Sequence, residues 1–219
     1  EQLRVSYAAS NRSYNHRLMA TYSTGTLPNG WAFSFSGSRR WAQEAYLPGS
    51  FYDAWSYFGA AEKKWNDKHS TSLNIIGSPG ESGKYSGAID EMYDLADNHY
   101  YNSYWGYQDG EKRNARKTHA HQPIFLLRHD WEMREDLSIM GAISYQFGTY
   151  GSTALDWYNA PDPRPNYYRK LPSYIEDPVL SAQVEEKFRN NESVRQVNWQ
   201  RMYDVNRHNM VTIHNVLGM

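Results

Sequence analysis

Strict alternation between aromatic and small polar residues over Trp31–Trp41 constrains the fold of this chain more than any other feature. The odd positions include Trp31, Phe33, Phe35 and Trp41, whereas the even positions are alanine, serine and arginine. Successive side chains of a β-strand point to opposite faces, so one face of this strand is aromatic and the other is rich in hydroxyl groups and positive charge. A strand of a soluble β-sandwich has this pattern, and so does a strand with lipid on one side and water on the other.

The same alternation returns elsewhere and predicts seven antiparallel strands, at about residues 3–10, 14–25, 31–41, 51–65, 69–79, 122–133 and 137–149. The turns at Leu27–Gly30, Asn66–Lys68 and Arg134–Asp136 are short, and the connections between them are long. Transmembrane β-barrels show this asymmetry, with strands of about 9–11 residues, short periplasmic turns and longer extracellular loops. We therefore predict an all-β fold, an antiparallel transmembrane β-barrel section with long extracellular loops at 80–121 and 150–219, and favour it over a soluble β domain.

The composition agrees with a water-filled lumen better than with a dry core. The 219 residues include 19 Tyr and 8 Trp, with a formal charge of -1 and no cysteine. A soluble core would use more Leu, Ile and Val, and disordered chains are poor in aromatic residues. The charge argues against a nucleic-acid partner, and the absence of cysteine excludes disulfides and thiolate metal sites. No apolar run reaches the length of about 18 residues that a transmembrane helix needs.

Several segments resemble barrel strands of TonB-dependent outer-membrane receptors of Bacteroidetes, and the likeness extends from Leu3 to about Asn206. The segments that carry it are Leu27–Trp41, Phe51–Phe58, Glu62–Ser70 and Tyr150–Leu155. The resemblance implies a 22-stranded barrel in the cell outer membrane, closed by an N-terminal plug, which imports a scarce ligand with energy relayed by TonB. It also implies as partners the outer-membrane lipid, TonB through regions outside this chain, the protein's own plug and remaining barrel strands, and a surface lipoprotein.

The chain departs from that family in lacking a TonB box, a plug sequence and a C-terminal aromatic strand. Glu1–Arg4 also lacks the apolar region of a signal peptide. Seven strands cannot close a barrel, and an open edge in lipid leaves backbone groups unpaired. We therefore expect an internal section of a longer receptor, which moves an iron chelate, vitamin, glycan or peptide without transforming it. Two alternatives stay open: a soluble β-rich carbohydrate-binding module, and a non-transporting barrel that scaffolds a surface lipoprotein complex.

Aromatic side chains in the two long loops are the candidate ligand-binding residues. Flat rings with polar edges stack on sugars, chelates or corrins, and they also anchor protein contacts. The candidates are Tyr100, Tyr101, Tyr104, Trp105 and Tyr107 in the first loop, with Trp157, Tyr158, Tyr167 and Tyr168 in the second. The alternative is that these rings pack the loops together.

No pattern in the sequence predicts catalysis, a cofactor or a metal site. His119 and His121 share one face of an extended strand, but no further ligands stand at the spacing that zinc requires. Met92, Leu95 and Ala96 have helical spacing, which favours a short amphipathic helix over a carboxylate site among their acidic neighbours. Val184–Arg207 is expected to be a partly helical loop.

Overall fold

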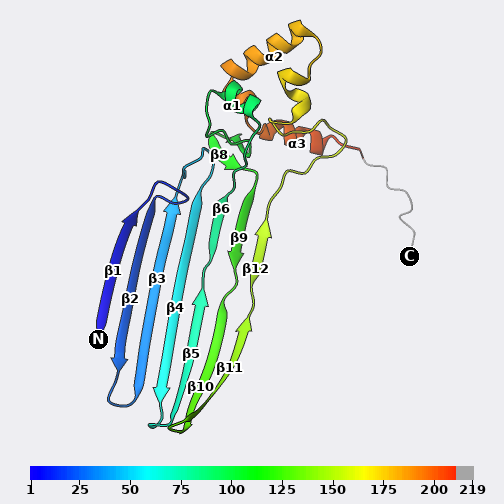
Figure 1. Ribbon diagram of the computed structural model, residues 1–219. Helices are drawn as coiled ribbons and strands as arrows, with labels where there is room; N and C mark the ends of the chain where they lie inside the picture. The colour runs from blue at the N-terminus through cyan, green and yellow to red at the C-terminus, as the bar shows by residue number, and fades with distance from the viewer. Residues whose placement is uncertain (211–219) are drawn as a thin grey trace, which may run out of the picture. The chain divides into compact units, whose positions relative to one another are not determined.

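The computed structural model describes residues 1–210 of the chain, and these residues form two compact units. The sheet unit consists of Glu1–Tyr46, Ser50–Gly83 and Lys117–Ser152. The helical unit consists of Leu47–Gly49, Lys84–Arg116 and Thr153–Met219, of which residues 211–219 lie outside the described part. Figure 1 shows the strands of the first unit and the helices of the second.

The sheet unit is one antiparallel sheet in the order β1-β2-β3-β4-β5-β10-β11, and β6, β9 and β12 continue it at one end (Figure 1). Consecutive strands β1 to β5 are neighbours, and only the step from β5 to β10 skips elements of the described chain. The strands are β1 (Gln2–Ala9), β2 (His16–Thr26), β3 (Trp31–Ala42), β4 (Tyr52–Lys64), β5 (His69–Gly77), β6 (Gly80–Gly83), β9 (Lys117–His121), β10 (Ile124–Arg134), β11 (Leu137–Gln146) and β12 (Thr149–Ser152).

Three pairs of these elements, β5 with β6, β9 with β10, and β11 with β12, each behave as one long strand. Tyr57 pairs with Gly77 and Asp53 pairs with Glu81, so the register of β4 is the same on both sides of the break. Pro79 and Pro123 stand at two of the breaks, where their missing N–H groups interrupt the ladder. Within residues 1–210, seven long strands therefore make up the sheet.

The predicted antiparallel β-fold is confirmed at this level, and each predicted strand segment contains a strand of the sheet. The sheet is not closed into a barrel, because β1 and β11 each have a strand neighbour on one side only among the described residues. The predicted long loops at 80–121 and 150–219 contain strands that the prediction left out. β6 and β9 extend the sheet into the first of these regions, and β12 extends it into the second. Sequence alternation misses β6, Gly80–Gly83, because that strand has no apolar residue.

The sheet has one apolar face and one polar face. Residues paired across antiparallel strands lie on the same face, and one such row runs through Tyr22, Phe35, Gly59, Ile75, Phe125 and Tyr145. The next row runs through Phe33, Ala61, Leu73, Leu127 and Ile143. Large side chains of this face are exposed to 53% at Phe35, 43% at Leu73 and 74% at Ile143, so nothing in the described residues covers them.

The opposite face carries hydroxyl groups that bond across the strands. Ser23 bonds to Ser34 at 2.7 Å, Thr21 to Ser36 at 2.9 Å, and Ser38 to Ser56 at 2.6 Å. A hollow of about 550 Å³ lies mainly on this face over β1 and β2. These three pairs of hydroxyl groups thus satisfy one another across the strands and need no dry core.

The helical unit contains α1 (Asp90–Ala96), the hairpin of β7 (Trp105–Gln108) and β8 (Glu111–Asn114), α2 (Pro178–Asn190) and α3 (Trp199–Arg207). Short 3-10 turns occupy Tyr168–Lys170, Pro172–Tyr174 and Glu192–Arg195. The expected helix around Met92 is confirmed, and so is the partly helical character of Val184–Arg207. The end of the predicted second loop, 211–219, lies outside the described residues. No helix in the described part is both long and apolar enough to cross a membrane.

The helical unit has its own apolar core, built from segments far apart in the sequence. Met92 and Leu95 of α1 pack with Tyr101, Leu171 and Phe188 of α2. A second cluster joins Ala115, Val197 and Trp199. Asp177 begins α2 by accepting hydrogen bonds from the backbone N–H groups of Val179 and Leu180, which satisfies two amides that lack a partner within the helix.

Arg195 lies at the C-terminal ends of two helices, α1 and α2. Its guanidinium donates to the carbonyls of Phe188 and Arg189 at the end of α2, and it lies 3.5 Å from the carbonyl of Leu95 in α1. We expect Arg195→Met, which keeps the length of the side chain but removes its donors, to destabilise the helical unit by about 1.5–3 kcal/mol. Faster hydrogen exchange at the C-terminal amides of α1 and α2 would report the loss. Arg207→Met on α3 is the control, because that guanidinium rests on the ring of Tyr203 instead; equal effects in both variants contradict the assignment.

Candidate functional site: a two-faced sheet and a cationic cavity

One end of the apolar face carries a belt of aromatic and charged side chains. Arg39 of β3 forms a bidentate ion pair with Asp53 of β4, with N···O distances of 2.9 and 2.8 Å. The guanidinium carbon of Arg39 lies 5.5 Å from the ring centre of Trp41 and 5.2 Å from that of Trp55. Stacking on indole rings keeps this cation at the edge of an apolar surface while its polar edge is satisfied.

A second belt lies where the short turns join the strands. His69 and His129 are 3.1 Å apart through their ring nitrogens, and Trp131 stacks on His69 with 5.5 Å between ring centres. The indole N–H of Trp65 donates to the hydroxyl of Thr71 at 2.9 Å. Rings with polar edges at both ends of an apolar surface are the arrangement found where a membrane β-barrel meets the lipid headgroups.

The distance between the two belts matches a bilayer. Trp31 at the start of β3 and Trp41 near its end lie on the same face, ten positions apart. At about 3.3 Å per residue this is about 33 Å along the strand. Strands of outer-membrane barrels tilt by about 35–45°, and at such a tilt a strand of this length covers a height of about 25 Å, the height of their apolar band.

The predicted aromatic residues of the first loop divide into packed and exposed rings. Tyr101 and Trp105 are buried, and the hydroxyl of Tyr101 donates to the carbonyl of Arg195 at 2.8 Å. Burial raises the pKa of Tyr101 above its ordinary value. Trp105 lies against Gly49, where a Cβ atom would collide with the indole. These two rings therefore hold the helical unit together. For them, the alternative that loop aromatics pack the loops together applies.

The remaining three rings of that loop are more accessible. Tyr104 is half-buried, with the guanidinium of Arg116 5.8 Å from its ring centre. Tyr100 and Tyr107 are exposed, and the ring centre of Tyr107 is 5.4 Å from that of Trp105 in an edge-to-face contact. These rings can take part in binding only at the surface of the unit.

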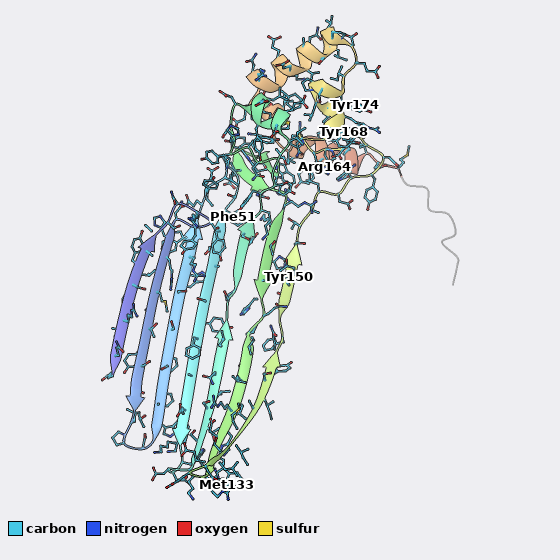
Figure 2. All side chains as sticks on the ribbon, in the orientation of Figure 1. Phe51, Met133, Tyr150, Arg164, Tyr168 and Tyr174 are labelled. Atoms are coloured by element: carbon cyan, nitrogen blue, oxygen red, sulfur yellow. The ribbon has the colours of Figure 1, made fainter. Side chains whose placement is uncertain are left out.

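In the second loop, three tyrosines gather into a surface cluster. Tyr167 and Tyr168 meet edge to face at 4.8 Å between ring centres, and Tyr168 meets Tyr174 in the same way at 5.2 Å. Figure 2 labels Tyr168 and Tyr174, together with Arg164. Arg164 lies over Tyr167. Tyr158 is exposed, with its hydroxyl 3.4 Å from a carboxylate oxygen of Asp156. Sequence reasoning selected Tyr158, Tyr167 and Tyr168 as ligand-binding candidates but did not select Arg164.

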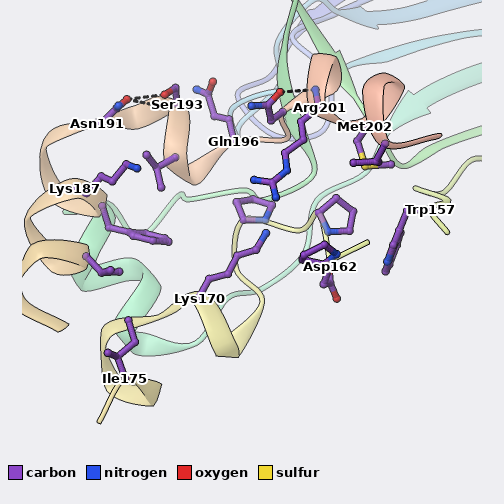
Figure 3. Close-up of a pocket in the computed structure, with 18 residues that line it drawn as sticks. Trp157, Asp162, Lys170, Ile175, Lys187, Asn191, Ser193, Gln196, Arg201 and Met202 are labelled. Carbon is purple, nitrogen blue, oxygen red and sulfur yellow. Dashed lines mark hydrogen bonds between the residues drawn. The ribbon is translucent and has the colours of Figure 1, made fainter. Parts of the chain in front are cut away.

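Trp157, the last of the predicted residues, lines a cavity of about 630 Å³ within the helical unit (Figure 3). Its walls come from the proline-rich segment Pro161–Pro165, the turn that ends at Lys170, α2 and α3. Three cationic side chains of this cavity, Lys170, Lys187 and Arg201, were not selected from the sequence. Their spacing in the chain is irregular, so no local pattern could have grouped them.

Asp162 is the only acidic residue on the cavity wall within the described part of the chain. Its carboxylate forms an ion pair with Arg164. Burial raises the pKa of Asp162, but the hydrogen bonds from the side chain and backbone of Arg164 outweigh it, so the pKa lies below its ordinary value. Asp162 is thus ionised at neutral pH and already engaged by a cation.

The two histidines considered as metal ligands are placed apart from further ligands. His121 Nε2 lies 2.9 Å from the hydroxyl of Tyr57, and the ring of His119 lies against Gly151. Among residues 1–210, no group of three or more histidine and carboxylate side chains could hold a metal ion.

Comparison with protein-family models, with curated proteins and with solved structures found no match to this chain.

Proposed function

We propose that this chain is a section of the β-barrel of an outer-membrane receptor that imports a ligand, of the TonB-dependent type that its strands resemble. The observation that carries the proposal is the sheet with one continuous apolar face, bounded by two aromatic belts, and one hydroxyl-rich face. Apolar side chains left in water cost about 25 cal/mol per Å². Soluble monomers rarely expose contiguous apolar patches beyond a few hundred Å².

The polar face then lines a water-filled or plugged lumen, and the apolar face meets hydrocarbon. In lipid, the unpaired edges at β1 and β11 require further strands, which the remaining part of a 22-stranded barrel supplies. The plug, the TonB contact and a surface lipoprotein are partners through regions beyond these residues. The long connections form the helical unit, and this unit captures the ligand at the cell surface. The ligand then passes through the barrel without being chemically changed.

A soluble carbohydrate-binding module is the competing function, and it requires the apolar face to be covered by a second layer of protein. Among the described residues of the sheet unit, Ala42 and Pro123 are buried, whereas the large apolar side chains of its apolar face are exposed. The sheet unit therefore supplies no such layer of its own.

Single cysteine substitutions test which face contacts lipid. The chain has no cysteine, so Phe35→Cys and Ser36→Cys each create one thiol, on neighbouring residues of opposite faces. In outer membranes of cells that produce the protein, we expect the thiol of the Phe35→Cys variant to resist a membrane-impermeant maleimide and to react with a lipid-soluble one. The thiol of the Ser36→Cys variant is expected to react with the impermeant reagent once the lumen is accessible.

Equal labelling of both thiols by the impermeant reagent, together with recovery of the protein in the soluble fraction, contradicts the proposal and favours the soluble module. Denaturation in urea before labelling is the control, because both thiols must then react fully. The result does not depend on knowing the ligand.

A further inference from the structure

The cavity of the helical unit has the size of a small-molecule site. Its volume of about 630 Å³ lies within the range of roughly 300–1,000 Å³ that is typical of ligand pockets. An inorganic ion would leave most of that space empty. Its walls come from several separate segments of the unit, so the space depends on the folded unit and not on one loop.

Positive charge dominates the polar part of the cavity. Lys170, Lys187 and Arg201 line it, against the single carboxylate of Asp162, which Arg164 already pairs. Figure 3 shows the side chains of Lys170 and Arg201 extending toward one another from the turn and from α3. Neither Lys187 nor Arg201 has a carboxylate partner among the described residues. Like charges that converge without a counter-ion repel each other, and a bound anion relieves that repulsion.

The environment of Lys170 agrees with this geometry. Its ammonium group donates to the carbonyl of Arg164 at 2.9 Å and keeps its other protons for further acceptors. Burial lowers the pKa of Lys170, Asp162 opposes the shift, and the guanidinium groups of Arg201 and Arg164 add to it. An anion placed between Lys170 and Arg201 offsets these unfavourable contributions.

Besides the charged residues and a few uncharged polar ones, the wall is apolar. Ile175, Val184, Phe188 and Met202 contribute aliphatic and aromatic surface. Trp157 makes no ring contact with another aromatic side chain in the described part of the chain. Gln196 also lines the cavity, is buried, and has a side-chain nitrogen without a hydrogen-bond partner among residues 1–210. An indole in the cavity wall and an unpaired amide donor fit a ligand that carries a ring and polar acceptors.

We infer that this cavity binds an organic anion that carries a ring beside its charged group, such as an acidic sugar. Lys170 and Arg201 hold the anionic group, Lys187 adds positive charge to the wall, and Trp157 stacks on the ring. The inference names the class of ligand for the proposed import function. The statement that this anion is imported rests on the proposed function, whereas the statement that the cavity binds it does not.

Isothermal titration calorimetry on the purified full chain in detergent tests the inference with three probes. The probes are a galacturonate oligosaccharide, a sulfated disaccharide and neutral maltotriose, so the carboxylate and sulfate arms distinguish the two kinds of anion. We expect at least one anionic probe to bind more tightly than maltotriose. Arg201→Gln is expected to weaken anion binding about tenfold, the effect of losing one charge-assisted contact, and Lys187→Gln is expected to weaken it less.

Arg207→Gln is the matched control on α3, because Arg207 lies over Tyr203 and does not line the cavity. High salt applied to the unaltered protein is a second measurement that needs no variant, and it should weaken anion binding only. Equal binding of all three probes, no binding of either anion, or variants that match the unaltered protein overturns the inference. If anion binding holds while the thiol of the Phe35→Cys variant labels from water, the membrane proposal alone fails.

Discussion

Leu73→Arg is expected to prevent stable insertion of the barrel, whereas Ser72→Arg is expected to be tolerated. Leu73 lies in the middle of the apolar face, between Ala61 and Leu127. If that face meets hydrocarbon, an arginine near the bilayer midplane costs about 2–4 kcal/mol. Urea unfolding of the protein in phospholipid vesicles would measure the difference.

The neighbouring Ser72 is the matched control, because it faces the other side of the same strand. Its cross-strand partners are Glu62 and Arg128, so a new arginine there has a carboxylate within reach and remains hydrated. Equal destabilisation by the two arginines contradicts a lipid-facing surface. A larger effect at Ser72 would indicate that the two faces have been assigned in reverse.

Phe188→Ala is expected to unfold the helical unit locally while leaving the sheet unit intact. Phe188 of α2 is 4% exposed and packs against Met92, Leu95, Tyr101 and Leu171. Truncating a buried phenylalanine costs about 3–5 kcal/mol through lost contacts and the cavity left behind. Hydrogen exchange should therefore become faster in α1 and α2 and stay unchanged in β2, β3 and β4.

Leu180→Ala in the same helix is the control, since that side chain is 50% exposed and should change stability by less than about 0.5 kcal/mol. Faster exchange in the strands of the sheet after Phe188→Ala would show that the two units unfold together. Phe188 also lines the cavity, so the same variant is expected to lose anion binding.

Several elements could be predicted because their signal lies within one short segment. The odd and even positions of Trp31–Trp41 fix the two faces of β3 without reference to any other strand. Met92 and Leu95, three residues apart, place one face of α1 in a core by the same kind of local argument. The seven strand segments follow from this periodicity, and the short turns follow from their own turn-forming residues.

Other elements depend on partners far away in the chain. β6 has glycine, glutamate and serine where strands usually have apolar residues, and pairing with β4 and β9 makes it a strand. Trp105 and Tyr107 look alike as loop aromatics, yet Trp105 packs beside Gly49 and Tyr107 stays exposed. Exposure of a ring is a property of its neighbours, and sequence pattern alone does not supply it.

The strand segments, their two chemically distinct faces and the short turns can be read from the chain without its fold, because each follows from the intrinsic geometry of a few consecutive residues. The grouping of Trp157, Lys170, Lys187 and Arg201 around one cavity emerges only on folding. These residues come from a proline-rich segment, a turn and two helices, and packing of Leu171 against Phe188 is one of the long-range contacts that bring the turn and α2 together. Long-range apolar contacts, which leave no local periodicity, thus created the charged site.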